Sequence, residues 1–284
     1  MPPVLSLIVY SVCIVAASLA GGWVTVWFKL SHTRLQIVIS FVAGLMLGIG
    51  LLHMLPHSVA YTHSLDRTLL FALFGLLAMF FLIRVFDFHH HGEAEHEHEH
   101  HGESCRASHR FSWVGVAIGL SLHTAIDGIA LAAAVMTESG AVGHDHGGMA
   151  TLGLGTFLVI LLHKPLDALS ITSLMAASGW STAARQATNA GFAMMCPLGA
   201  LLFFFGFSGN PEIIGAALAF AAGTFICISL ADLLPELQFH THDRGKLSVA
   251  LLLGVALAYG IGLLEGENHG GIHQHGGEVH AEGE

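Results

Sequence analysis

The chain has 284 residues, of which 54% are hydrophobic and only 11% are charged, and its mean hydropathy is +0.68. Soluble domains carry about a quarter charged residues, so this composition excludes an ordinary soluble domain and favours a protein embedded in a lipid bilayer. The net charge of −10, with 22 histidines, excludes the basic surface that nucleic-acid binding requires and suits the binding of cations.

Eight apolar runs follow one another along the chain. Each is long enough to cross about 30 Å of hydrocarbon as a helix that rises about 1.5 Å per residue. No Lys or Arg precedes the first run, so we expect a spanning helix there and not a cleavable signal peptide. The predicted spans are Val4–Phe28, Leu35–Met54, Thr68–Phe88, Phe111–Met136, Thr151–Ala177, Ala187–Phe207, Ile213–Phe239 and Leu247–Leu264.

A polar, His-rich loop separates the third and fourth runs. It is of low complexity and short of apolar residues, so we expect it to be disordered in the absence of metal. The histidines of this loop that are candidates for capturing metal are His89, His90, His91, His96, His98, His100 and His101. A second His-bearing segment, acidic in character, forms the tail at 265–284.

The distribution of Lys and Arg between the connections predicts the orientation of the chain. Connections with odd numbers, counted from the N-terminus, hold seven of these residues: Lys29, Arg34, Arg106, Arg110, Arg185, Arg244 and Lys246. The even side holds only Arg67. Because cytoplasmic loops carry the excess of positive charge, we expect the odd connections, with the His-rich loop, in the cytoplasm. Both termini and the acidic tail are then outside it.

Two apolar segments of eighteen residues resemble one another without a gap. The segment FVAGLMLGIGLLHMLPHS begins at Phe41 in the second span, and FAAGTFICISLADLLPEL begins at Phe220 in the seventh. One runs outward from the cytoplasm and the other runs back, so together they indicate an inverted repeat. Secondary transporters built in this way hold their substrate near the bilayer midplane, between the repeats. Chance similarity between two apolar segments is the alternative.

The fourth and fifth spans each contain the pattern His-x-x-x-Asp. In the fourth span it is His123 with Asp127, and in the fifth it is His163 with Asp167. Residues four apart lie on one helix face, so two such helices side by side offer two imidazole nitrogens and two carboxylates. This set suits tetrahedral zinc, and it also admits Fe2+, Mn2+, Co2+ or Cd2+.

The position of these residues within apolar spans strengthens the prediction of a metal site. An ionised Asp or Lys at the centre of a helix costs about 2.5–3.5 kcal/mol on insertion scales. Asp127, Asp167 and the neighbouring Lys164 are therefore expected to face one another or a water-filled path. A salt-bridge cluster that only ties the two helices together is the alternative.

Other polar residues within the spans suggest a route for the metal. In the second span, His53 and His57 are predicted to line an entrance path from the outer surface, because His is rare within spans. Near the cytoplasmic end of the seventh span, Asp232 and Glu236 flank a proline and are predicted to form an exit path. Pairing of Glu236 with Arg244 or Lys246 is the alternative for the exit residue.

These features resemble the ZIP (Zrt-/Irt-like protein) family of divalent metal transporters. The segments HTAIDG and HKPLDA are similar to the family's fourth-helix and fifth-helix motifs, and GTFICISLADLLPE is similar to its seventh helix. The resemblance implies an all-α membrane protein with eight transmembrane helices in a 3+2+3 inverted-repeat arrangement. It also implies import of zinc or a related divalent metal toward the cytoplasm, by an elevator-like motion in a homodimer.

The resemblance also implies roles for individual residues. It places His123, Asp127, His163 and Asp167 at the primary metal site, with Met46 as a neighbouring ligand and His53 on the entrance path. Many family members have an adjacent second metal site, and three residues depart from its ligands here: Thr124, Lys164 and Cys196. A protonated Lys cannot bind a cation, so we expect one metal and not two.

The expected division of the chain follows from these features. It comprises helices 1–3 at 1–88, the His-rich loop at 89–110, the metal-binding helices at 111–180, helices 6–8 at 181–264 and the external tail at 265–284. A short chain of this kind suits a bacterial inner membrane. The alternative functions are a cation-diffusion-type metal/proton exporter, which normally has six spans, and a membrane metal sensor that does not transport. No enzyme motif is evident, and the helix-borne HExxH of zinc-dependent proteases is absent.

Overall fold

The computed structural model describes residues 2–27, 32–87, 112–141, 153–207, 209–239 and 244–266, and all regular structure in these ranges is helical. The helices are α1 (Pro3–Trp27), α2 (His32–Ile49), the π-helix η1 (Gly50–Met54), α3 (Leu55–Thr62), α4 (Leu65–Asp87), α6 (Ser112–Ala141), α7 (Leu154–Ala177), α8 (Thr182–Ala193), α9 (Met195–Phe207), α10 (Pro211–Phe239) and α11 (Arg244–Gly266). Eight helical segments of the described residues are long and apolar enough to cross a membrane. The predicted all-α fold and the number of spans are therefore confirmed.

The second span is longer than predicted, because the helix continues past Pro56. Proline lacks the N–H that a regular helix would bond to the carbonyl four residues earlier. The wide turn of η1 lies directly before this proline, and the N–H of Leu55 bonds to the carbonyl of Gly50, five residues back. The segment then runs on as α3 until His63, whose left-handed backbone (φ 50°) ends the helix.

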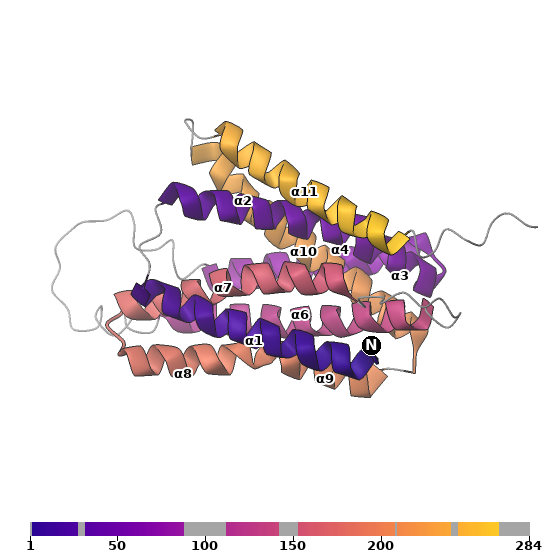
Figure 1. Ribbon diagram of the computed structural model, residues 1–284, viewed down its shortest axis with the longest axis horizontal. Coiled ribbons are helices and arrows are strands. Elements are labelled where there is room, and N and C mark those ends of the chain that lie inside the picture. The colour runs from indigo at the N-terminus through magenta and orange to yellow at the C-terminus, as the bar shows by residue number, and fades with distance from the viewer. Residues whose placement is uncertain are drawn as a thin grey trace, which may run out of the picture.

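The sixth span begins earlier than predicted and consists of two helices, α8 and α9. The break lies at Met194, between the end of α8 at Ala193 and the start of α9 at Met195. Pro197 explains its position, because a proline ring collides with the carbonyl four residues earlier, here that of Ala193. The two helices continue in nearly the same direction along the bundle (Figure 1).

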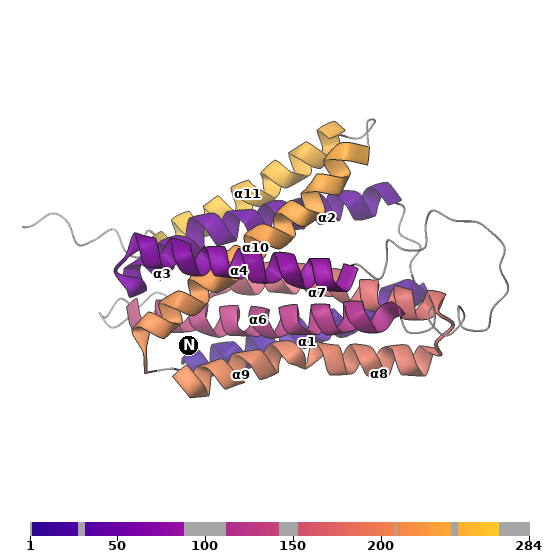
Figure 2. The same cartoon turned by 180° about the vertical axis from the view of Figure 1, so that it is seen from behind.

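The helices form a bundle in which the first two elements lie far apart. In both views α2 and α11 lie at one edge and α1, α8 and α9 lie at the opposite edge, with α6 and α7 between them (Figures 1 and 2). The most extensive helix pairs are α2 with α11, α4 with α10, α6 with α9, and α1 with α7. The long helix α10 runs obliquely across the back of the bundle (Figure 2).

Helices α2 and α11 cross at a reciprocal pair of glycines. A Cβ atom on Gly44 of α2 would collide with the backbone carbonyl of Leu251 on α11, and a Cβ on Gly254 of α11 would collide with the carbonyl of Phe41 on α2. Each glycine thus lies over the carbonyl three residues before the partner glycine. Small residues at membrane helix interfaces let backbones approach in this way, so this crossing depends on both glycines.

Two further crossings repeat this geometry. Gly75 and Gly223 join α4 to α10, and Gly128 and Gly199 join α6 to α9. In each, the carbonyl beneath a glycine belongs to the residue three positions before the partner glycine; these residues are Phe220, Ala72, Cys196 and Ala125. Gly44 and Gly223 are aligned positions of the two eighteen-residue segments. The segments therefore make equivalent crossings, one with α11 and the other with α4.

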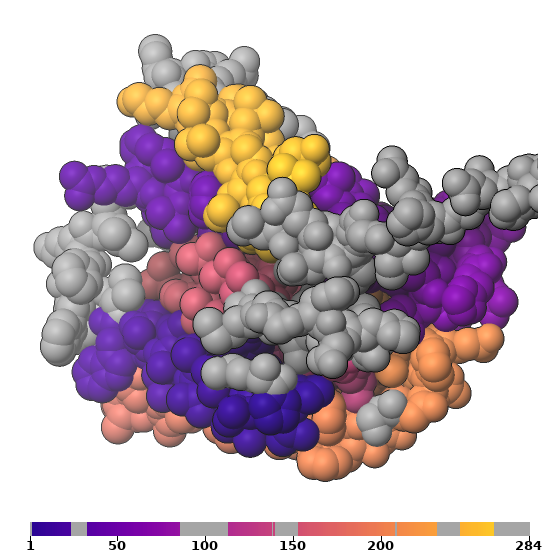
Figure 3. Space-filling view, turned by 45° about the vertical axis from the view of Figure 1, so that its right-hand side comes forward, coloured from indigo at the N-terminus to yellow at the C-terminus, as the bar shows by residue number. Residues whose placement is uncertain are grey.

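The outer faces of the bundle carry large apolar side chains, as a surface in contact with lipid should. On α1 the residues Val4, Ile8 and Val12 are 45%, 51% and 63% exposed, and they recur every four positions. On α11, Leu252 and Leu253 are also exposed. Figure 3 shows the face of the molecule on which α1 (indigo) and α11 (yellow) lie. Patches of this kind on a soluble protein would mark binding sites or aggregation.

Candidate metal centre

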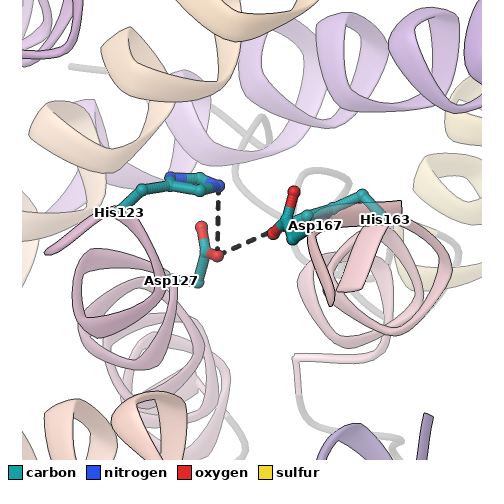
Figure 4. A group of neighbouring side chains, drawn as sticks. All are labelled: His123, Asp127, His163 and Asp167. Atoms are coloured by element: carbon teal, nitrogen blue, oxygen red, sulfur yellow. Dashed lines mark hydrogen bonds and ion pairs between the residues drawn. The ribbon is translucent and has the colours of Figure 1, made fainter. Parts of the chain in front are cut away.

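The two His-x-x-x-Asp patterns meet inside the bundle. His123 and Asp127 project from α6, and His163 and Asp167 project from the adjacent α7 toward the same point (Figure 4). One potential ligand atom from each of the four residues lies within 4.8 Å of the others. His123, Asp127 and His163 are buried, and Asp167 is partly buried. The structure therefore brings together the four residues that the sequence predicted as a metal site.

One carboxylate oxygen, Oδ2 of Asp127, is shared by both histidines. It lies 3.3 Å from Nε2 of His123 and 3.2 Å from Nε2 of His163. Ligands about 2.0–2.1 Å from a tetrahedral zinc ion lie about 3.3–3.4 Å from one another. The two N–O distances match this spacing, while Asp167 Oδ2 lies slightly farther out, 3.8 Å from His163 Nε2.

A backbone carbonyl orients the ring of His163. Nδ1 of His163 lies 2.8 Å from the carbonyl oxygen of Val159, one turn earlier in α7. A carbonyl can only accept, so Nδ1 carries a hydrogen, and Nε2 is the nitrogen that faces the carboxylate of Asp127, 3.2 Å away. Such second partners commonly fix the orientation and the ligating tautomer of histidine, which leaves Nε2 to bind a metal.

Lys164 places an ammonium group beside the four residues. Its Nζ donates hydrogen bonds to Asp127 Oδ2 at 2.5 Å, to Asp167 Oδ2 at 2.9 Å and to Thr124 Oγ1 at 2.9 Å. The side chain is only 1% exposed, and the ring of Phe192 on α8 lies 5.7 Å from Nζ. The lysine thus compensates both carboxylates from within the bundle and does not reach the membrane surface.

The other residues predicted around this site are buried. Thr124 contacts Lys164, as described above. Cys196 is fully buried on α9, where its carbonyl lies beneath Gly128 of α6. Met46 is 1% exposed and belongs to the main buried cluster of the bundle, which also contains Phe225. The sequence provides no signal at Cys196 or Met46 that separates a role in metal binding from a role in packing.

One residue that contacts the site was missed in the sequence. The ring of Phe225 on α10 lies edge-on to His163, with the ring centres 6.2 Å apart, and it is fully buried. A phenylalanine in an apolar span carries no signal of its own. The internal repeat does supply one, because Phe225 aligns with Met46 when Phe41 is aligned with Phe220.

The predicted entrance residues lie outside the four-residue site. His53 belongs to η1 and His57 to α3, and their rings are stacked with centres 6.2 Å apart. Together with Met54, Thr137 and Thr156 they line a cavity of about 10 Å3, which is about the space of one water molecule. The two histidines are therefore close to one another and next to α6 and α7, the helices that carry the metal ligands.

The side chains of the remaining predicted residues lie outside the described part of the chain. Asp232 and Glu236 lie within α10, and their side chains are outside the described part of the chain. The His-rich loop from His89 to His101 and the tail at 267–284 lie outside the described residues. The proposed exit path and the capture of metal by the loop therefore stay predictions.

Comparison with known proteins identifies relatives of the chain. The family model described as ZIP Zinc transporter matches residues 87–262, which is more than half of the chain. The protein Zinc transporter ZIP9-B from Xenopus laevis is 29% identical over 151 residues, which are 50% of this chain and 46% of that protein. Zinc transporter ZIP9 from Micropogonias undulatus is 29% identical over 140 residues, covering 47% and 42% of the two chains. Zinc transporter ZIP9 from Macaca fascicularis is 28% identical over 134 residues, covering 45% and 53%. The chain thus spans about half the length of these curated relatives.

Proposed function

Because the chain belongs to the ZIP zinc transporter family, we propose that it carries divalent metal ions across a membrane, with zinc as the principal substrate. The observation that carries this proposal is the cluster of His123, Asp127, His163 and Asp167 within a bundle of membrane-spanning helices. Imidazole and carboxylate ligands suit zinc, and they also accept Fe2+, Mn2+, Co2+ and Cd2+. Buried ionisable groups in membrane helices commonly mark ion pathways.

Transport toward the cytoplasm through alternating access is the proposed mechanism. The repeat supports this mechanism, because its aligned glycines Gly44 and Gly223 make equivalent helix crossings. A 3+2+3 arrangement of the eight helices follows if α1–α4 and α8–α11 are the two repeats. In such transporters one body moves against the other around a fixed site. We propose an elevator-like form of this motion, in a homodimer.

The repeat also relates the proposed entrance to the proposed exit. Aligning Phe41 with Phe220 places His53 opposite Asp232 and His57 opposite Glu236. The entrance path would thus use two positions of the first repeat, and the exit path would use the equivalent two positions of the second. Metal would pass from the histidine pair to the four-residue site and then to the carboxylates near the cytoplasmic end of α10.

Orientation and location complete the proposal. The excess of Lys and Arg in the odd connections supports a cytoplasmic His-rich loop and external termini. The relatives described above come from animals and give no support to a bacterial inner membrane, which stays a prediction. A multi-pass membrane location rests on the eight spanning helices.

Flux measurements on the purified protein in lipid vesicles test the proposed function. The rate of radioactive zinc uptake is compared with the rate of efflux under opposite gradients, and unlabelled metals are added as competitors. Uptake of radioactive zinc that unlabelled zinc inhibits more strongly than the other metals supports the proposal. Zinc export that is driven by an opposing proton gradient favours the cation-diffusion-type alternative, and binding without flux in either direction favours a sensor.

The four-residue site is expected to hold one metal ion. The ammonium of Lys164 contacts Oδ2 of both Asp127 and Asp167. A unit charge about 4 Å from a like charge at an effective dielectric of about 20 costs about 4 kcal/mol, which disfavours a second ion there. Anomalous scattering from zinc-soaked crystals should therefore show one ion at this site in the natural protein. Lys164→Asp removes the repulsion and adds a ligand, so it should permit a second ion. Two ions beside Asp127 in the natural protein would refute the expectation.

Deletion of the loop from His89 to His101 should leave transport intact but change its dependence on metal supply. The loop is polar and lies between two spans, so it can gather metal but cannot form the path through the bilayer. Uptake is measured over a range of zinc concentrations in cells that express equal amounts of each protein. Complete loss of uptake by a correctly inserted deletion variant would contradict this role.

A further inference from the structure

The metal site contains a fixed positive charge that belongs to the protein itself. Lys164 Nζ lies 2.5 Å from Asp127 Oδ2 and 2.9 Å from Asp167 Oδ2, and the side chain is buried. With both imidazoles neutral, as metal binding requires, two carboxylates and one ammonium give the site a net charge of −1. A bound divalent ion changes this net charge to +1. Without the lysine, the corresponding charges would be −2 and 0.

These two patterns of charge have different consequences for a site that crosses a membrane. The cost of placing a charge in a medium of low dielectric rises with the square of the charge. With the lysine, the empty and the loaded site each carry one unit and therefore cost about the same to move. Without it, the loaded site is neutral, whereas the empty site carries two units and costs about four times as much as a single charge.

We propose that Lys164 is the residue that lets the emptied site return across the membrane. This inference rests on the proposed function, because only a carrier that alternates between two faces must move its site empty. Two helices fix the position of the ammonium. Lys164 belongs to α7, and Thr124 of α6 accepts the third hydrogen bond of its Nζ. Asp127 Oδ2 faces both histidines and also accepts from Lys164, so the ammonium and the incoming metal would share this carboxylate oxygen.

A comparison of net zinc uptake with zinc exchange isolates the return of the empty site from the other steps of the transport cycle. Net uptake into metal-free vesicles requires the empty site to return in every cycle, whereas exchange of labelled for unlabelled zinc requires only the loaded site to cross. Both rates are measured at saturating zinc with the membrane potential clamped at zero. In Lys164→Gln the ratio of net uptake to exchange should fall about tenfold or more, which corresponds to about 1.4 kcal/mol in the barrier to return. Lys246→Gln, at an exposed position of α11, is the matched control and should keep the natural ratio.

A second variant covers the case in which Lys164→Gln does not fold. Lys164→Gln combined with Asp167→Asn restores a charge of −1 to the empty site and +1 to the loaded site. It should therefore recover the natural ratio of net uptake to exchange, even if its affinity for zinc is lower. Recovery of the folding yield alone would also fit a purely structural lysine, so the ratio of net uptake to exchange, and not the yield, decides.

The outcomes that overturn the inference are distinct from failure of the proposed function. An unchanged ratio in Lys164→Gln, with net uptake and exchange lowered equally or not at all, would show that the lysine serves folding or binding only. A ratio that stays low in the double variant would also overturn the inference. Absence of zinc movement by the natural protein in both modes would instead overturn the proposed function on which the inference depends.

Discussion

His163→Ala is expected to reduce zinc uptake to background while the protein still folds and inserts. Nε2 of His163 lies 3.2 Å from Asp127 Oδ2, the oxygen that both histidines and Lys164 face. Loss of even the outer partners of a metal ligand commonly costs 10–100-fold in affinity or activity, so loss of a ligand should cost at least about 100-fold. This substitution leaves Lys164 between its two carboxylates and therefore uncovers no buried charge.

Asp127→Asn tests the same site from the other helix. It keeps the size of the side chain but removes the charge that faces both histidines and Lys164, so uptake should again fall to background. His63→Asn and Asp66→Asn are the matched controls, because both residues are exposed outside the site and Asn tolerates the left-handed backbone of His63. Normal uptake by His163→Ala and Asp127→Asn at equal expression would contradict the assignment of the site.

Gly44→Leu is expected to prevent the folding of the protein altogether. A Cβ at this position would already collide with the carbonyl of Leu251, so a larger side chain would force α11 away from α2. Overpacking by single methylene groups costs about 1–3 kcal/mol, and collision with a backbone leaves fewer ways to relax. The measurement is the yield and thermal stability of detergent-purified protein on size-exclusion chromatography.

Graded and matched variants sharpen this test. Gly44→Ala and Gly254→Ala should each lower the melting temperature, and by similar amounts, because the two glycines make the same contact from opposite sides. Gly260→Leu is the control, since no atom of the described residues lies within 4 Å of a Cβ built there. If Gly44→Leu were as stable as Gly260→Leu, the close crossing of α2 and α11 would be wrong.

The grouping of the four candidate metal ligands was predictable because their relation is local. A spacing of four residues fixes which side chains share a helix face, and the apolar surroundings of His123, Asp127, His163 and Asp167 required that they face one another. The meeting of both histidines on a single oxygen of Asp127 was not predictable. It depends on the distance and rotation between α6 and α7, which follow from tertiary packing.

Other features required information that a single sequence hides. Lys164 was placed near the site, but its position on the two carboxylates rather than at a membrane surface follows from three-dimensional contacts. The break at Met194 and the wide turn at Gly50–Met54 each precede a proline, yet proline alone does not say whether a helix kinks, widens or stops. Phe225 carries no chemical signal at all, and only the repeat connects it with Met46.

The wide turn at Gly50–Met54 shifts the phase of the second span. A turn closed over five residues instead of four accommodates one additional residue, and one residue corresponds to about 100° of rotation about a helix axis. Residues before Gly50 and after Met54 therefore do not fall on one continuous helical wheel. A deletion of one residue within η1 would turn the outer part of the span, with His57, by about a quarter turn relative to Met46.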